Sequence, residues 1–289
     1  MDASEILKKV RKIEIKTKGL SKHIFSGEYH SAFKGRGMSF SEVRDYQYGD
    51  DVRNIDWNVT ARTGSPHIKV YEEDRELTVI LMVDISRSSV FGSMRQFKSE
   101  ITAEISAVIA FSAISNNDKV GAILFTDKVE KYIPPKKGKS HILRIIREII
   151  YYEPESRKTD IDQALIYLNN VQKKRAIVFL LSDFFSSPFD QALSIAQKRH
   201  DIIGLHIYDK WEKELPDIGL IKTIDPETNA EFMIDSSNAK IRSLYAKNFS
   251  NNQENFSTLF KKNKLDHMSI STEDDYVKSL LQFFKRRTS

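Results

Sequence analysis

The sequence predicts an α/β fold with a doubly wound, mostly parallel sheet, preceded by an N-terminal, mainly-β and irregular subdomain. Short apolar runs bounded by turn residues, such as 77–83 and 177–181, are typical of strands buried in a parallel sheet. Strand-like and helix-like segments alternate from residue 77 onward, which indicates repeated βα units. A chain of 289 residues, of which 40% are hydrophobic, is long enough for such a domain with an added subdomain.

The composition excludes several classes of function. The chain has no cysteine, so disulfides, thiolate zinc sites, cysteine nucleophiles and iron–sulfur clusters are ruled out. The net charge is only +5, and no local basic cluster is interleaved with aromatics in a recognition pattern. We interpret these clusters as solvated faces and expect no nucleic-acid partner.

The apolar runs are also too short for a membrane protein. Spanning a bilayer takes roughly 20 apolar residues. The first 20 residues are charged throughout and lack the apolar core of a signal peptide. We therefore expect no membrane insertion and a cytoplasmic protein.

The N-terminal subdomain is predicted to cover residues 1–74. Apolar positions at helical spacing predict a charged helix over 1–18, which Gly19 ends. Glycines, aromatics and dense charge then predict short strands and loops over 25–69, closing with a strand at 67–70. The main domain is predicted over 75–289, with a hairpin–helix insertion at about 212–263.

Within this subdomain, residues 40–62 alternate carboxylates and arginines around aromatic side chains. An isolated buried charge is very costly, so these charges must pair if they are buried. One interpretation is an ion-pair lattice that joins the subdomain to the main domain. The other is a partner-docking face, because aromatics and arginines dominate interface hot spots. The docking hypothesis names Tyr48, Asp50, Asp51, Arg53, Asp56, Trp57 and Arg62.

The first half of the main domain begins with the strand at 77–83. A long amphipathic helix is expected over 94–115. Its predicted apolar face consists of Phe97, Ile101, Ile105, Val108 and Ile109. Two strands at 120–125 and 129–133 flank a short turn and form a hairpin. Ser140 is expected to cap a helix that runs to residue 150.

The second half repeats the alternation and then adds an insertion. Thr159 or Asp160 opens a predicted helix that ends at residue 169. A turn-rich segment between 220–224 and 231–234 predicts a β-hairpin. The remaining predicted strands are 177–181, 202–208 and 267–271, and the remaining predicted helices are 188–199, 239–262 and 276–284.

Oxygen-bearing side chains follow the buried strands. Asp84, Ser86 and Ser88 come at the end of the first strand, Asp183 follows the strand at 177–181, and Thr159 opens a helix. In a doubly wound sheet these positions share the carboxyl edge, where such folds bind ligands. Two carboxylates and three hydroxyls suit a hard cation such as Mg²⁺. The simpler interpretation is a strand end whose serines cap the next helix.

The D-x-S-x-S of Asp84, Ser86 and Ser88, with Thr159 and Asp183 on later loops, resembles the metal-ion-dependent adhesion site of von Willebrand factor type A domains. The resemblance implies that the serines and the threonine coordinate Mg²⁺, or alternatively Mn²⁺ or Ca²⁺. It implies that the aspartates act largely through water or hydrogen bonds. An acidic residue of a partner would complete the shell.

A second resemblance covers nearly the whole chain. The stretch YGDDVRNIDW with the following AR, the hairpin TID-PETNAEFMID and the ending TEDDY…LLQFFKRR resemble bacterial domain-of-unknown-function family fifty-eight. Members often accompany MoxR-type AAA+ ATPases. Many carry N-terminal membrane helices, which this sequence lacks, and commonly have Met where this chain has Ser89-Val90. Neither departure removes a ligand.

These features together predict a non-enzymatic, metal-dependent adaptor that binds an acidic residue of a client and works with a MoxR-type ATPase in protein maturation or complex assembly. The alternative is a Mg²⁺-dependent hydrolase acting on phosphate esters, with Asp84 as nucleophile. Such enzymes would need a second carboxylate at position 86, where this chain has serine.

Overall fold

The computed structural model describes residues 11–14, 29, 32–33, 38–73, 76–90, 97–225 and 229–288. The chain forms two compact units, one of residues 33–77 and one of residues 1–32 together with 78–289. The prediction instead grouped residues 1–74. Residues before 33 belong to the larger unit, where the Tyr29 ring packs edge-on against Phe284 with centroids 6.1 Å apart.

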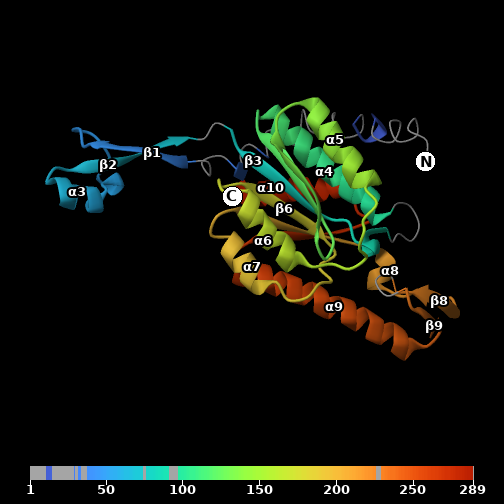
Figure 1. The fold of residues 1–289 in the computed structure, drawn as a ribbon. Helices are drawn as coiled ribbons and strands as arrows, with labels where there is room; N and C mark the ends of the chain where they lie inside the picture. Colours follow the sequence, from blue (N-terminus) through green and yellow to red (C-terminus); the bar gives the residue numbers. More distant parts are fainter. Residues whose placement is uncertain are drawn as a thin grey trace. The chain divides into compact units, whose positions relative to one another are not determined.

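The smaller unit is a two-stranded antiparallel ribbon with a short helix (blue in Figure 1). Strand β1 (Met38–Asp45) pairs with β2 (His67–Glu73), and between them lie the 3-10 helix η2 (Val52–Asn54) and α3 (Trp57–Thr63). The N-terminal β portion is therefore present as predicted. The helix that was predicted over 1–18 lies mostly outside the described residues.

The larger unit is built on a six-stranded sheet of order β10-β7-β6-β3-β4-β5. All neighbouring pairs are parallel except β4 and β5, which are antiparallel. This confirms the predicted doubly wound, mostly parallel α/β class. The strands are β3 (Thr78–Asp84), β4 (Lys119–Phe125), β5 (Val129–Lys136), β6 (Ile177–Ser182), β7 (Asp201–Tyr208) and β10 (Asp266–Ser271).

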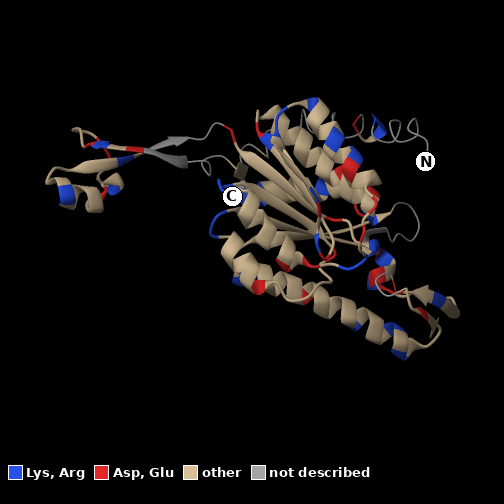
Figure 2. Ribbon diagram, in the orientation of Figure 1, with Lys and Arg blue, Asp and Glu red and all other residues tan. Residues whose placement is uncertain are grey.

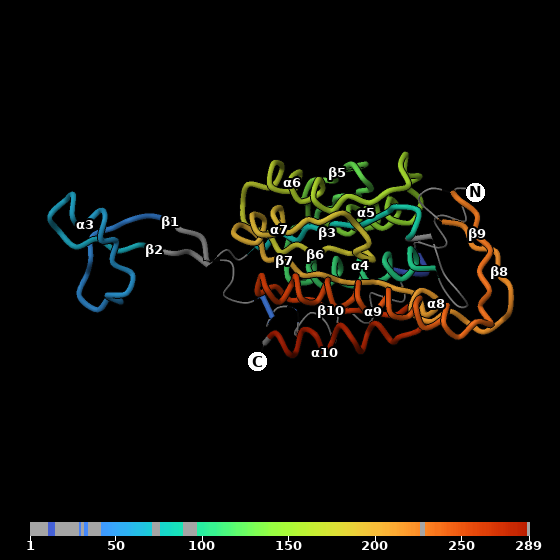
Figure 3. The backbone as a smooth tube through the Cα atoms, turned by 90° about the horizontal axis from the view of Figure 1, so that it is seen from below, coloured from blue at the N-terminus to red at the C-terminus, as the bar shows by residue number. Residues whose placement is uncertain are grey.

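Helices cover both faces of this sheet (Figures 1 and 3). One face carries α4 (Lys98–Ser115), α5 (Lys139–Tyr151) and α10 (Tyr276–Thr288). The other carries α6 (Ile161–Val171), α7 (Asp190–Ala196) and α9 (Ala239–Lys262). Apolar residues of α6, α7 and α9 form one buried cluster with strand residues such as Met82 and Leu180. Close packing explains Gly204, because a Cβ there would lie 2.5 Å from the Phe260 ring.

The prediction for α4 was partly wrong. Residues 94–96 lie outside the described residues, and the helix begins at Lys98. It has no exposed polar stripe, since the sheet and its neighbouring helices enclose it and bury Thr102, Glu104 and Ser106. Phe97, which was assigned to the apolar face, precedes the helix and is 50% exposed. The polar residues of α4 therefore do not indicate a solvent-exposed face of the helix.

Two smaller predictions about helix ends also need correction. Ser140 lies inside the first turn of α5, and Gly138 is the N-cap with φ of 105°, a conformation that favours glycine. Helix α7 is shorter than the predicted 188–199. Asp160 does open α6, since its side chain accepts a hydrogen bond from Gln163 N at 3.1 Å.

The predicted insertion follows β7. It comprises α8 (Lys210–Lys213), the hairpin of β8 (Leu220–Ile224) and β9 (Glu231–Asp235), and α9. Asp209 and Glu212 form a capping box that begins α8. Within the part of the chain that the structure describes, no helix is long and apolar enough to cross a membrane.

Candidate functional site

The candidate site lies at the topological switch point of the sheet, where the strand order reverses. Strands β3 and β6 are parallel neighbours, but the chain continues from β3 to β4 on one side and from β6 to β7 on the other. Open α/β sheets bind ligands at the carboxyl ends of strands at such a point. Asp84 is the last residue of β3, and Asp183 follows directly on the last residue of β6.

The loop after β3 folds back on Asp84. One oxygen of this carboxylate, Oδ1, accepts a hydrogen bond from Ser86 N at 2.9 Å. The other, Oδ2, accepts one from Ser182 Oγ at 2.6 Å, so both oxygens already have protein partners. The hydroxyls of Ser86 and Ser88 share a hydrogen bond of 3.1 Å. The D-x-S-x-S motif thus presents two neighbouring hydroxyls beside a fixed carboxylate.

Asp183 is held by a lysine that the sequence did not single out. Its Oδ1 accepts a hydrogen bond from Phe185 N at 3.2 Å, and its Oδ2 lies 3.0 Å from Lys98 Nζ. Lys98 Nζ also lies 2.6 Å from Glu212 Oε1, and the lysine side chain is only 3% exposed. The ammonium therefore links Asp183, in the loop after β6, to helix α8. The signal that could have identified Lys98 is its position in a helix that has no solvent-exposed face for a charged side chain.

Burial and mutual repulsion shape the ionisation of these groups. Burial and the Asp183 carboxylate raise the pKa of Asp84 to about 6. Burial also opposes ionisation of Asp183, but Lys98 and a hydrogen bond from Ser88 hold its pKa below the ordinary value. Burial likewise opposes the charge on Lys98, yet Asp183 and Glu212 raise its pKa overall. Burial raises the pKa of Glu212 despite Lys98.

Thr159 is buried but less closely joined to the other four predicted ligands. The Ser186 hydroxyl donates to Thr159 O at 3.4 Å, and Arg87 N donates to Arg157 O at 3.4 Å. These bonds tie the loop before α6 to both other loops. Among the described residues, no hydrogen bond joins the Thr159 hydroxyl to the Asp84, Ser86, Ser88 and Asp183 cluster. The structure thus brings four of the five side chains together.

The cluster encloses a small cavity lined by Asp84, Ser88, Lys98, Thr102, Ser182 and Asp183, among others. Its volume is about 10 Å³, near the minimum for one water molecule. Among the described residues, no three His, Asp or Glu side chains converge as a metal site. A cation here therefore depends on hydroxyls and water, with the hydrogen-bonded Asp84 acting indirectly. That donor set fits a small, hard ion.

The docking hypothesis concerns the smaller unit, where the charges mostly pair with one another. Asp50 accepts two hydrogen bonds from Arg44 at 2.8 and 2.9 Å. Asp51 pairs with Arg53 at 2.7 Å, and Asp56 caps α3 by accepting from Asn58 N and Val59 N. The charges are coloured in Figure 2. The exposed predicted residues are Tyr48, Asp51, Arg53, Trp57 and Arg62.

The strand order and the switch-point site define a doubly wound α/β protein with a mostly parallel sheet. The chain belongs to the family described as "Protein of unknown function DUF58", which matches residues 42–255. It is 27% identical over 293 residues to the uncharacterized protein Rv1480 of Mycobacterium tuberculosis, covering 99% of this chain and 91% of the relative. The predicted family membership is thereby confirmed.

Solved structures show weaker similarity. A conserved hypothetical protein, BatB from Bacteroides thetaiotaomicron, matches with a TM-score of 0.45 and 15% identity, covering 73% of this chain and 98% of that one. The VWA domain of SpRpn10 matches with a TM-score of 0.36 and 12% identity, covering 71% and 93%.

Proposed function

We propose that this protein is a non-enzymatic adaptor that binds a client through a divalent cation at the switch point. Ser86, Ser88 and Thr159 would supply hydroxyl ligands to Mg²⁺, with Mn²⁺ and Ca²⁺ as alternatives. Asp84 and Asp183 would act through water and hydrogen bonds. The bound ion would offer a Lewis-acidic position to a client carboxylate. The observation that carries this proposal is the cluster of buried Asp84, Ser86 and Asp183 with the half-buried Ser88.

The charge balance of the cluster supports a cation. Among the described residues, Lys98 pairs with Asp183 and Glu212, while Asp84 and Asp183 repel each other. With all groups ionised, three negative charges and one positive charge leave a net charge of −2. Buried charge of one sign is costly unless it is compensated. A divalent ion would neutralise the cluster without displacing Lys98.

The residue at position 86 favours an adaptor over a hydrolase. A hydrolase with Asp84 as nucleophile would need a second carboxylate there, and this chain has Ser86. The hydrolase alternative would be tested with a phosphatase and nuclease panel in Mg²⁺ or Mn²⁺. Turnover that Asp84→Asn abolishes would favour the enzyme over the adaptor.

The metal proposal is tested by calorimetric titration and thermal unfolding with Mg²⁺. The wild-type chain should bind the ion and gain about 2.7 kcal/mol of stability at 100 times the dissociation constant. Asp84→Ala should abolish both effects. Asp190→Ala removes an exposed carboxylate at the start of α7 and should leave both unchanged. Equal Mg²⁺ binding by Asp84→Ala would refute the assignment.

We further propose that the smaller unit docks a MoxR-type AAA+ ATPase through its exposed aromatics. Tyr48 and Trp57 are 104% and 70% exposed, and Val52 is 61% exposed. Side chains of this size that stay in water are candidates for an interface core. The test is capture of a purified MoxR-type ATPase by the full chain, with and without EDTA. Capture unaffected by Tyr48→Ala and Trp57→Ala would contradict this docking face.

A further inference from the structure

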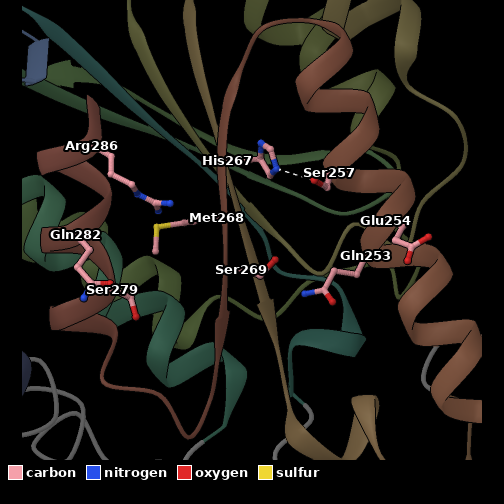
Figure 4. A pocket seen from close by; sticks show the side chains of 9 residues that line it. All are labelled: Gln253, Glu254, Ser257, His267, Met268, Ser269, Ser279, Gln282 and Arg286. Carbon is pink, nitrogen blue, oxygen red and sulfur yellow. Dashed lines mark hydrogen bonds between the residues drawn. The ribbon is translucent and has the colours of Figure 1, made fainter. Parts of the chain in front are cut away.

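A groove lies beside β10 on the outer edge of the large sheet. Its volume is about 510 Å³. Helix α9 forms one wall and α10 the other, and β10 runs between them (Figure 4). Strand β10 pairs with β7 on its inner side, and among the described residues no strand pairs with its outer side. The groove therefore exposes a sheet edge between two helices.

The backbone direction along β10 follows from its hydrogen bonds. Thr272 N donates to Tyr208 O at 2.9 Å, so Thr272 faces β7. In a parallel pair, alternate residues direct both backbone groups to the same side. Met268 and Ile270 therefore face β7, while His267, Ser269 and Ser271 face outward. The outward Ser271 N is already bonded to Asp274 Oδ2 at 2.9 Å.

The groove thus presents the N–H and C=O groups of His267 and Ser269. The His267 side chain turns to α9, and the Ser269 side chain turns to β7. His267 Nε2 lies 3.0 Å from Ser257 Oγ of α9, and Ser269 Oγ lies 3.1 Å from His206 Nδ1. Met268 extends toward the α10 side in Figure 4. Unpaired edges of this kind are templates for strand addition.

The side chains on the two walls indicate which kind of segment could bind in the groove. They carry amides and hydroxyls from Gln253, Ser257, Ser279 and Gln282, with one carboxylate, Glu254, and one guanidinium, Arg286. Among the described residues no carboxylate pairs with Arg286, so it is available to an acidic side chain. An extended segment that carries an acidic side chain would complement this exposed guanidinium.

We propose that the outer edge of β10 docks an extended segment of a partner protein, which adds a strand to the sheet and directs an acidic side chain to Arg286. Main-chain hydrogen bonds to His267 and Ser269 give the affinity, and the polar walls select the side chains. This site is separate from the switch-point cluster and does not require a metal ion.

The experiment uses a phage-displayed library of random dodecapeptides selected on the full chain in EDTA. Enriched peptides are synthesised, and their affinities are measured for the wild type, Ser269→Pro and Ser269→Ala. Proline removes the outward N–H without breaking the ladder to β7, and strand edges tolerate it at such a position. Alanine removes the same hydroxyl but keeps the N–H, so it is the matched control.

The expected result is similar affinity for the wild type and Ser269→Ala, and binding at least about tenfold weaker for Ser269→Pro. Arg286→Ala should weaken binding of acidic peptides, and added Mg²⁺ should leave the peptide affinity of the wild type unchanged. Failure of the metal site is thus distinguishable from failure of this one. Should Ser269→Pro not fold, hydrogen exchange on the wild type must show peptide-induced protection at His267 and Ser269.

Three results would overturn the proposal. The first is a selection that enriches no peptide. The second is an enriched peptide that binds Ser269→Pro as well as Ser269→Ala, or that fails to protect the His267 and Ser269 amides. The third is a wild-type protein that is dimeric and becomes monomeric on Ser269→Pro. That result would identify the occupant of the groove as a second copy of the chain.

Discussion

The switch-point cluster and the smaller unit contain the same kinds of ion pair in opposite surroundings. Lys98 lies 3.0 Å from Asp183, and Arg53 lies 2.7 Å from Asp51. The side chains of the first pair are 3% and 4% exposed, whereas those of the second are 86% and 42% exposed. The distances are similar, but water surrounds only the second pair.

This contrast shows that burial, and not distance, decides what a charge contributes. Breaking a buried pair leaves an uncompensated charge in a low dielectric and is strongly destabilising. An exposed pair is screened by water and salt, and its removal is often not measurable. We therefore expect the switch-point charges to govern folding and ligand binding, and the exposed charges of the smaller unit to affect only partner contacts.

The largest expected effect is that of Lys98→Met. The substitution leaves Asp183 and Glu212 buried without a cation, so we expect a loss of about 3–5 kcal/mol in the free energy of unfolding. Urea denaturation at pH 7 in EDTA measures it. Adding Asp183→Asn to Lys98→Met should recover part of the loss. A loss below about 1 kcal/mol would mean that the cluster is not a low-dielectric site.

The next effect is a pH dependence carried by His206. Burial lowers its pKa to about 4, from an unfolded value of 6.5. Between these values the unfolded chain binds more protons than the native chain, so stability falls as the pH drops from 6.5 to 4. The difference of 2.5 pH units corresponds to about 3 kcal/mol.

His206→Phe removes this contribution and keeps an aromatic ring beside Phe249 and Phe256. Denaturation curves at several pH values should therefore show a flatter acid limb for the variant than for the wild type. Parallel curves over that range would show that folding does not lower the pKa of His206.

The third prediction concerns the exposed aromatics of the smaller unit. Trp57→Ala should weaken capture of a MoxR-type ATPase roughly tenfold, since a central aromatic often contributes more than 1 kcal/mol to an interface. The melting temperature should stay unchanged because the side chain is 70% exposed. Binding titrations measure the affinity for the ATPase, and calorimetry measures the melting temperature. A large fall in melting temperature would assign Trp57 a structural role instead.

The smallest effect is expected for Asp51→Asn. The carboxylate holds the pKa of Arg53 above its ordinary value, yet both side chains are in contact with water. The stability of the variant should match that of the wild type at low and at moderate salt. A clear loss in low salt would show that this pair belongs to a stronger network.

Periodicity predicted most strands and helices of the larger unit and the strand ends at which the oxygen-bearing side chains lie. The run that ends at Asp84 and the run that ends before Ser182 and Asp183 are buried strands, and their carboxyl ends are adjacent. The hairpin of β8 and β9 followed from its turn residues. Local patterns suffice for such features because they depend on neighbours a few residues away.

Two predictions failed at helix ends. Phe97 precedes α4 and is 50% exposed, and Gly138, not Ser140, is the N-cap of α5. Tyr29 joined the larger unit through Phe284, at the other end of the chain.

The sequence by itself determined the order of strands and helices and the position of the oxygen-bearing side chains at the strand ends, because both are set by short-range chemistry. Only the tertiary structure decided that Lys98 is buried between Asp183 and Glu212, 85 and 114 residues away. It also decided that α9 and α10 leave the outer edge of β10 open. The physical reason is that solvent exclusion is a property of the assembled fold, and no short segment encodes it.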